Sequence, residues 1–207
     1  MLFRSLLAVM RKHQRYLPVF KDGKLLPYYI TIANGASLDV DVVRHGNNEV
    51  LRARYAAAVY FYDSDIKKPL ADYTPALDTL TFQEHLGSVL DKVHRMEKLV
   101  PVLADMLGLD AAEKAAAERA AAICKSDLAT QLVVEHTSLQ GELGRHYAEL
   151  SGETPAVALA IAEHYLPRFT GDRLPASKAG LVVGLADRID SMVGLFAVGI
   201  KPSSGAG

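Results

Sequence analysis

The chain has 207 residues, with 23 Lys and Arg against 24 Asp and Glu, one Cys and no Trp. Half of the residues are hydrophobic, which excludes a wholly disordered chain, and a net charge of −1 excludes a protein that is basic throughout. The one cysteine, Cys124, excludes an internal disulfide, and the apolar run at residues 6–10 is too short for a membrane span or a good signal peptide. We therefore expect a reduced, soluble and cytoplasmic protein that does not contact a membrane.

Basic residues are concentrated at the start of the chain. Residues 1–30 contain six Lys or Arg and one Asp, whereas residues 81–207 contain 12 basic and 16 acidic residues. A basic segment on an acidic body can steer a polyanion such as RNA towards the protein. Composition leaves the alternative, an ordinary solvated surface, open.

Residues 16–32 are expected to form a β-hairpin. Two segments rich in β-branched and aromatic residues flank the turn-forming pair Asp22-Gly23. From about Asp39, apolar residues recur at three- and four-residue steps, which predicts a helix that is interrupted around residues 46–48. The first third of the chain is therefore expected to be α+β.

After Thr81 the pattern is helical. Thr81 and Glu84 have the spacing of a capping box, and an apolar stripe follows them as far as Met106. Asp110 is placed to cap an alanine-rich helix that runs towards Cys124. Further helices are expected at residues 127–135, 138–150, 155–166 and 177–197.

These patterns divide the chain near residues 68–80. Residues 1–75 are expected to form an α+β segment, and residues 76–202 a mainly α-helical domain. Residues 203–207 are rich in Ser, Gly and Ala and resemble a frayed or truncated end.

No motif of a self-sufficient active site is present in the sequence. It contains no phosphate-binding Gly-Lys-Ser/Thr loop, no dinucleotide-binding glycine fingerprint and no nucleophile elbow. Cys124 follows Ala-Ala-Ile, a context that is typical of a buried small hydrophobic residue rather than a nucleophile.

Three segments of the helical part, residues 121–128, 161–175 and 184–190, resemble the HD superfamily of metal-dependent phosphohydrolases. Members of that superfamily bind metal through a His, a later His-Asp pair and a final Asp. The resemblance implies an HD-like domain. It places five residues at the positions of a degenerate HD site: His94, Lys125, Asp127, His164 and Asp187.

The central His-Asp pair is missing from these motifs, because residues 125–127 read Lys-Ser-Asp. A divalent metal needs convergent imidazoles and carboxylates, and a lysine ammonium repels it. We therefore expect no metal at this site. The alternative that stays open is a metal-dependent nucleotide phosphohydrolase with three ligands and a helper residue: Asp127, His164, Asp187 and His94.

In the HD order of helices, Asp127 and Asp187 approach each other in a partly buried site. Two such carboxylates repel, so a cation must compensate or one carboxyl must take up a proton. We expect Lys125, Arg188 or His164 to compensate, which makes the site a structural polar cluster. Replacing Asp187 by Asn should then change the stability only modestly.

A longer series of motifs occurs in order along most of the chain. Three of them are Arg-Lys-His-Gln-Arg-Tyr-Leu-Pro-Val at residues 11–19, Gly-Asn-Asn-Glu-Val-Leu-Arg-Ala-Arg at residues 46–54, and Leu-Ala-Asp-Arg-Ile-Asp at residues 185–190. From about residue 7 to residue 202, the series resembles the bacterial tetrameric glycyl-tRNA synthetase beta subunit.

This second resemblance implies that the chain is a central fragment of such a subunit, non-catalytic and inactive when alone. Residues 1–75 would be the end of the tRNA-synthetase B-type region of that subunit, and residues 76–202 its HD-like domain. It would support ATP-dependent glycyl-tRNA synthesis by binding tRNA(Gly) and by assembling with the alpha subunit into an α2β2 enzyme. In this family the alpha subunit holds the catalytic core. ATP and Mg are therefore expected there, and no cofactor is expected in this chain.

Four basic residues are the candidates for contacts with the tRNA backbone: Arg11, Lys12, Arg15 and Lys24. Such contacts would add salt-dependent affinity without reading the base sequence. Each of the four could instead be an ordinary exposed charge. Tyr16, Tyr28 and Tyr29 could stack on unpaired nucleotides or pack as half-buried strand residues.

Overall fold

The computed structural model describes residues 10, 16–35 and 38–200. The predicted frayed end at residues 203–207 lies outside the described residues. Within the described ranges, no helix is both long and apolar enough to cross a membrane.

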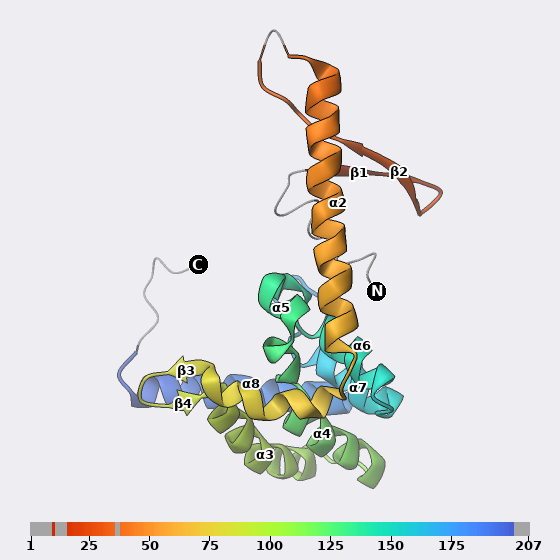
Figure 1. The fold of residues 1–207 in the computed structure, drawn as a ribbon. Coiled ribbons are helices and arrows are strands. Elements are labelled where there is room, and N and C mark those ends of the chain that lie inside the picture. Colours follow the sequence, from red (N-terminus) through yellow and green to blue (C-terminus); the bar gives the residue numbers. More distant parts are fainter. Residues whose placement is uncertain (1–9, 11–15, 36–37, 201–207) are drawn as a thin grey trace.

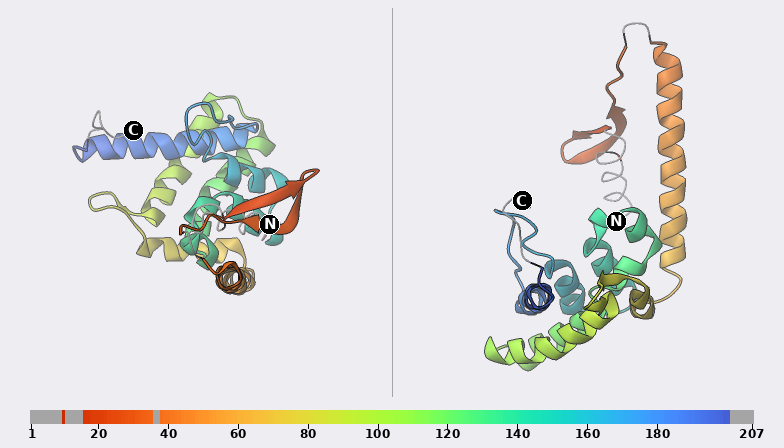
Figure 2. Two further views of the ribbon diagram at one scale, coloured as in Figure 1. Left: turned by 90° about the horizontal axis from the view of Figure 1, so that it is seen from above. Right: turned by 90° about the vertical axis from the view of Figure 1, so that its left-hand side faces the viewer.

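The molecule is a hairpin and a long helix attached to a mainly helical body. The hairpin consists of β1 (Leu17–Lys21) and β2 (Lys24–Ile30), and the long helix is α2 (Val40–Asp65). Figure 1 shows α2 projecting from the body with the hairpin beside its first half, and the two views of Figure 2 agree. The predicted hairpin and helical part are thus confirmed, whereas the HD-like identity and the boundary at residue 75 stay predictions.

The turn of the hairpin uses the two residues that the sequence favours. Asp22 and Gly23 have φ angles of 49° and 73°, the left-handed conformation that the tightest hairpin turns require. The strands are antiparallel, with Leu17 opposite Ile30 and a shift of register after Pro18.

Two tyrosines attach the hairpin to α2. The Tyr29 hydroxyl donates to Asn48 Oδ1 at 2.6 Å, and the Tyr16 hydroxyl donates to Asn47 Oδ1 at 2.9 Å. The two tyrosine rings also stack on each other, with centroids 5.0 Å apart. Tyr16 and Tyr29 therefore pack in the structure, whereas Tyr28 is 66% exposed.

Helix α2 begins where the sequence predicts, because the Asp39 side chain accepts two backbone N–H bonds of the first turn. The predicted interruption at residues 46–48 is wrong, since the helix runs through them. Gly and Asn cost a helix up to about 1 kcal/mol each relative to Ala. Here the side chains of Asn47 and Asn48 bond to hairpin tyrosines, so tertiary contacts outweigh the local propensity.

The body is packed around helix α4 (Ala111–Ile123), whose Ala117, Ala120 and Ala121 are fully buried. Helices α3, α7 and α8 all contact α4, because its small side chains allow their close approach. In chain order, the other elements of the body are η1 (Leu70–Thr79), β3 (Thr81–Gln83), β4 (Gly87–Ser88), α3 (Val89–Met106), η2 (Ser126–Ala129), α5 (Gln131–Glu135), η3 (Thr137–Leu139), α6 (Glu142–Leu150), α7 (Pro155–Glu163) and α8 (Lys178–Ala197).

One predicted helix start is wrong and another is confirmed. Thr81 begins strand β3 and lies opposite Ser88, so it does not cap a helix. Helix α3 starts after Ser88 instead, whose Oγ accepts the Asp91 N–H while the Asp91 carboxylate accepts the Ser88 N–H. The predicted cap at Asp110 is confirmed, with Glu113 completing a second capping box.

Two of the predicted helices are broken into shorter pieces. Residues 127–135 divide between η2 and α5, and residues 138–150 divide between η3 and α6. Gly141, between the last two, has a φ of 79°, which an α-helix does not allow. The helices predicted at residues 155–166 and 177–197 are present as α7 and α8, although α7 ends at Glu163, three residues before its predicted end.

Asp65 fixes the end of α2 to the body. Its carboxylate is buried and accepts the backbone N–H groups of Gln131 and Leu132, at 2.8 and 3.0 Å, where α5 begins. The Tyr147 hydroxyl of α6 donates to the same carboxylate at 3.0 Å. A negative charge at the first turn of a helix is favourable, so one side chain satisfies free backbone donors and connects three elements.

Replacing Asp65 by Ala should lower the free energy of unfolding by about 2–4 kcal/mol, because it leaves buried donors without an acceptor. Chemical denaturation followed by circular dichroism measures this change. Asp63→Ala, at an exposed position two residues earlier, is the control and should stay within about 0.5 kcal/mol of the wild type. Equal effects of the two substitutions would contradict the assigned role of Asp65.

Candidate functional site

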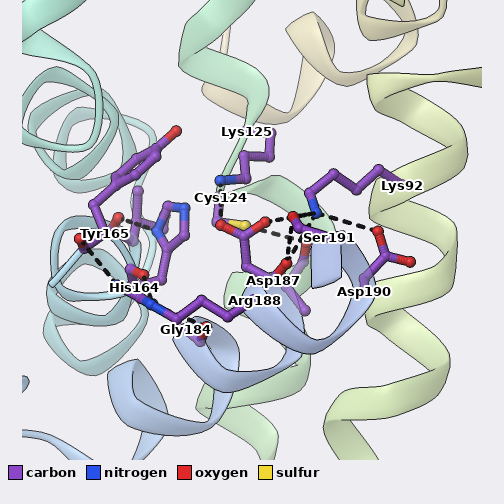
Figure 3. Close-up of polar contacts among 12 residues, drawn as sticks. Lys92, Cys124, Lys125, His164, Tyr165, Gly184, Asp187, Arg188, Asp190 and Ser191 are labelled. Carbon is purple, nitrogen blue, oxygen red and sulfur yellow. Dashed lines mark hydrogen bonds and ion pairs between the residues drawn. The ribbon is translucent and has the colours of Figure 1, made fainter. Parts of the chain in front are cut away.

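Charged side chains meet inside the body where α3, α7, α8 and the segment after α4 come together (Figure 3). We call five of these residues the buried polar cluster: Lys92, Lys125, His164, Asp187 and Asp190. Lys92 and Lys125 are only 4% and 5% exposed, and His164 is fully buried. Figure 3 shows Lys92 reaching towards both Asp187 and Asp190, and Lys125 beside Asp187.

The carboxylate of Asp187 lies between two ammonium groups. Lys125 Nζ is 2.8 Å from Asp187 Oδ2, and Lys92 Nζ is 2.9 Å from Asp187 Oδ1. Burial alone would raise the pKa of Asp187, but the two ammonium groups outweigh burial and hold this pKa well below its ordinary value. Asp187 is therefore ionised over the whole physiological range.

Lys92 also connects α3 to the next turn of α8. Its Nζ donates to Asp190 Oδ2 at 3.1 Å and to Ser191 Oγ at 2.7 Å. Arg95, one turn further along α3, bonds to both carboxylate oxygens of Asp190. The charges of the cluster are thus paired and hydrogen-bonded, which buried charges require.

Lys92 and Asp190 are not among the residues predicted for this site from the sequence, although Lys92 gives a signal there. Lys92 occupies the apolar face of α3 that contains Val89, Val93 and Met96, where a charge is unexpected. The predicted residue His94 lies two positions further on and is exposed, because two positions turn a helix by about 200°. His94 therefore does not join the cluster.

Asp127 is fully buried and bonds to backbone rather than to a cation. Its Oδ2 accepts the N–H groups of Gly141 and Gly144, at 2.6 and 3.1 Å, at the start of α6. A Cβ on Gly144 would lie 2.8 Å from Asp127 Oδ2, so this approach requires glycine. Burial raises the pKa of Asp127 to about 6, although these N–H bonds and Lys125 partly offset it.

His164 is held as a neutral imidazole. Its Nδ1 is 2.6 Å from the Ile161 carbonyl, which can only accept, so Nδ1 carries the proton and Nε2 is an acceptor. Burial and the Lys125 ammonium both lower the pKa of His164 well below its ordinary value. The Tyr165 ring lies 3.9 Å from the imidazole, and Lys125 Nζ lies 4.2 Å from the Tyr165 ring centroid.

Arg188 follows Asp187 on α8 but has a different role from the one expected. Its guanidinium donates to the backbone carbonyls of residues 164–167, which follow α7, and to the Gly184 carbonyl. It therefore neutralises the partial negative charge at the end of α7. Lys125 is the sequence-predicted cation that contacts the Asp187 carboxylate.

The residues at this site do not fit a divalent metal. Asp127 Oδ1 and His164 Nε2 have no hydrogen-bond partner among the described residues, so potential ligand atoms exist. However, the ammonium groups of Lys92 and Lys125 contact the third predicted ligand, Asp187, and would repel a cation there. In the part of the chain that the structure describes, no three His, Cys, Asp or Glu side chains are placed to hold a metal ion.

The other sequence-predicted residues lie apart from the cluster or outside the described part. Lys24 is exposed at the start of β2, on the hairpin, whereas Arg11, Lys12 and Arg15 lie outside the described residues. Cys124 is confirmed as a buried small side chain, and burial raises the pKa of its thiol to about 12. A thiol with that pKa is a poor nucleophile at neutral pH.

Replacing Asp187 by Asn should lower the free energy of unfolding by about 2–4 kcal/mol, since it leaves the Lys125 ammonium buried without a carboxylate. This effect is larger than the modest change expected from the sequence, because two buried lysines contact Asp187. Chemical denaturation measures it. The control is Asp105→Asn, which removes an exposed ion pair with Lys114 and should lower the free energy of unfolding by less than about 1 kcal/mol. A similarly small effect of Asp187→Asn would show that the cluster contributes little to the stability.

The raised pKa of Asp127 predicts a dependence of stability on pH. The Asp127 carboxyl takes up a proton at about pH 6 in the folded chain but only near pH 4 in the unfolded chain. Proton binding to Asp127 therefore stabilises the folded chain at low pH, and this contribution is lost as the pH rises through 6. The Asn of Asp127→Asn does not titrate. We therefore expect the stability advantage of the wild type over this variant to grow by about 1 kcal/mol between pH 7 and pH 5.

Urea denaturation of both chains at pH 5, 6 and 7 measures this difference. His164 is present in both chains, so its own opposite effect, a loss of stability as the pH falls below its unfolded pKa, cancels in the comparison. A difference that is constant, or that shrinks towards pH 5, would show that Asp127 is ionised throughout.

Comparison with known proteins identifies the family. A family model described as "Glycyl-tRNA synthetase beta subunit" matches residues 4–206. Curated relatives named glycine–tRNA ligase beta subunit include those of Gloeothece citriformis, 49% identical over 202 residues, and Clostridioides difficile, 48% identical over 194 residues. These matches cover 95% and 94% of the chain but only 28% of each relative, so the chain spans little more than a quarter of their length. The chain belongs to the glycyl-tRNA synthetase beta subunit family.

Proposed function

We propose that the chain is a non-catalytic part of a glycyl-tRNA synthetase beta subunit. It supports ATP-dependent glycyl-tRNA synthesis by helping to hold tRNA(Gly) and by assembling with the alpha subunit into an α2β2 enzyme. The observation that carries this proposal is the family match over residues 4–206. In this proposal the alpha subunit holds the catalytic core, ATP and Mg.

The buried polar cluster supports a structural role for the helical body. Lys125, His164 and Asp187 come from the segments with HD-like motifs, and their side chains lie near one another in Figure 3, with Lys125 paired to Asp187. This convergence supports the proposal that the body is an HD-like domain whose metal site has been replaced by lysines. A metal-dependent nucleotide phosphohydrolase would need a metal ion beside Asp187, where the ammonium groups of Lys125 and Lys92 lie instead. The lysines already neutralise the Asp187 carboxylate, which favours the non-catalytic role.

The hairpin supports a role in RNA binding. Lys21 and Lys24 flank its turn, opposite each other and exposed, and α2 holds this turn at a distance from the acidic body. Lysines at such a position contact phosphates as point charges and release counterions, which gives affinity that depends on salt.

Replacing Lys24 by Glu should weaken tRNA(Gly) binding by roughly 3- to 10-fold at low salt and reduce the slope of log affinity against log salt by about one. The measurement is a filter-binding titration at several salt concentrations. It uses a full-length beta subunit that contains this chain, assembled with its alpha subunit. Lys98→Glu is the matched control, since Lys98 is an exposed lysine on α3 of the body.

Two outcomes would contradict this proposal in different ways. Equal affinity and equal salt slope for wild type and Lys24→Glu would exclude the hairpin lysine from the tRNA interface. A wild-type assembly that does not bind tRNA(Gly) at low ionic strength would exclude the tRNA-binding role altogether.

A further inference from the structure

Three buried polar atoms in and beside the buried polar cluster have no partner. They are Asp127 Oδ1, His164 Nε2 and Tyr165 Oη, and none of them forms a hydrogen bond with any of the described residues. Buried polar side-chain atoms in folded proteins are nearly always hydrogen-bonded, either to protein or to ordered water. Three unpaired atoms in one region therefore point to a ligand that the chain itself does not supply.

The Tyr165 ring brings His164 and Lys125 together. Its centroid lies 3.9 Å from the centroid of the His164 imidazole and 4.2 Å from Lys125 Nζ. Figure 3 shows the Lys125 side chain reaching towards the His164 ring beside Tyr165. The ammonium group and the imidazole are therefore neighbours inside the body.

Asp127 lies close to the same tyrosine ring. Its Oδ2 accepts the Gly141 N–H at 2.6 Å, and a Cβ on Gly141 would lie only 2.6 Å from Tyr165 Cδ2. The backbone of Gly141 thus contacts both side chains, so the unpaired Oδ1 of Asp127 belongs to the same region as the other two atoms.

Lys125 and His164 have complementary groups to spare. An ammonium group has three N–H donors, and the acceptor that Lys125 reaches among the described residues is Asp187 Oδ2, at 2.8 Å. His164 carries its proton on Nδ1, so Nε2 is an acceptor, and no donor of the described residues reaches it. A spare donor and a spare acceptor therefore lie near each other without a direct hydrogen bond.

This set of groups selects water among the small ligands. Water can accept from Lys125 Nζ and donate to His164 Nε2 at the same time, and its second hydrogen is available for Asp127 Oδ1 or Tyr165 Oη. A halide ion has no hydrogen to donate to an imidazole acceptor. A metal cation would be repelled by the Lys125 ammonium.

We propose that an ordered water molecule is bound inside the body, where it accepts a hydrogen bond from Lys125 Nζ and donates one to His164 Nε2. This water connects the segment after α4 to the end of α7. It satisfies buried polar groups at a position whose motifs resemble a metal centre, while Lys125 supplies the positive charge. The proposal is independent of the proposed tRNA-binding role.

A high-resolution crystal structure of the 207-residue chain tests the proposal directly. We expect one well-ordered density peak within about 2.7–3.2 Å of both Lys125 Nζ and His164 Nε2, without anomalous scattering. A direct hydrogen bond between these two nitrogens, or no peak between them, would overturn the proposal. Anomalous scattering at the peak would also overturn it and would assign the site to a metal or chloride ion.

Oxygen-17 relaxation dispersion of water tests the same proposal in solution, because it counts the long-lived internal water molecules of a protein. His164→Phe removes the acceptor, so we expect the count to fall by about one. His94→Phe is the matched control, since His94 is exposed on α3, and it should leave the count unchanged.

An unchanged count in folded His164→Phe would contradict the proposal, as would an equal decrease in both variants. Circular dichroism shows whether each variant is folded. The crystal structure requires no substitution, so it decides the question even if His164→Phe does not fold.

Discussion

The carboxylate of Asp187, held between the ammonium groups of Lys92 and Lys125, is the interaction on which the arrangement of the body depends. It joins α3, α8 and the segment after α4 through two contacts shorter than 3 Å, in a site from which water is largely excluded. A buried charge is tolerated only when a partner neutralises it. Separating α8 from these lysines would leave Lys125 buried without its carboxylate and Lys92 with Asp190 alone, so the network favours the observed position of α8 against α3 and α4.

Two buried carboxylates organise the protein in different ways. Asp187 pairs with cations, whereas Asp65 accepts two backbone N–H groups and a tyrosine hydroxyl. The first interaction orders the helices inside the body. The second fixes the last turns of α2 against α5 and α6, together with the hydrogen bond between the Tyr62 hydroxyl and His146 Nε2 and the burial of Ala58 in the core, so these contacts set the direction in which α2 carries the hairpin. Any ligand of the hairpin is therefore held in a defined place relative to the helical body.

The sequence predicts those elements whose signals are local. Asp22-Gly23 predicts the hairpin because both residues tolerate positive φ, and Asp110 predicts the start of α4 because its side chain caps free N–H groups. Two local patterns give wrong predictions. Thr81 does not cap a helix because it pairs with Ser88 in a strand, and residues 46–48 do not interrupt α2 because Asn47 and Asn48 bond to the hairpin tyrosines. Similarly, motifs indicate Lys125 and Asp187, and Lys92 stands out as a charge on the apolar face of α3. That Lys92 pairs with Asp187 is determined by helix packing, which a single sequence does not display.

The body buries charged side chains, whereas the hairpin exposes apolar ones. Both features depart from the usual distribution of side chains, and they have different consequences. The buried charges of the body find their counterions within the same chain, so their desolvation is compensated without any partner. The exposed apolar side chains of the hairpin have no such compensation, because Leu17, Tyr28 and Ile30 are in contact with water. The buried charges of the body therefore need no counterion from outside this chain, whereas any segment that covers these hairpin side chains would remove apolar surface from water and stabilise the hairpin.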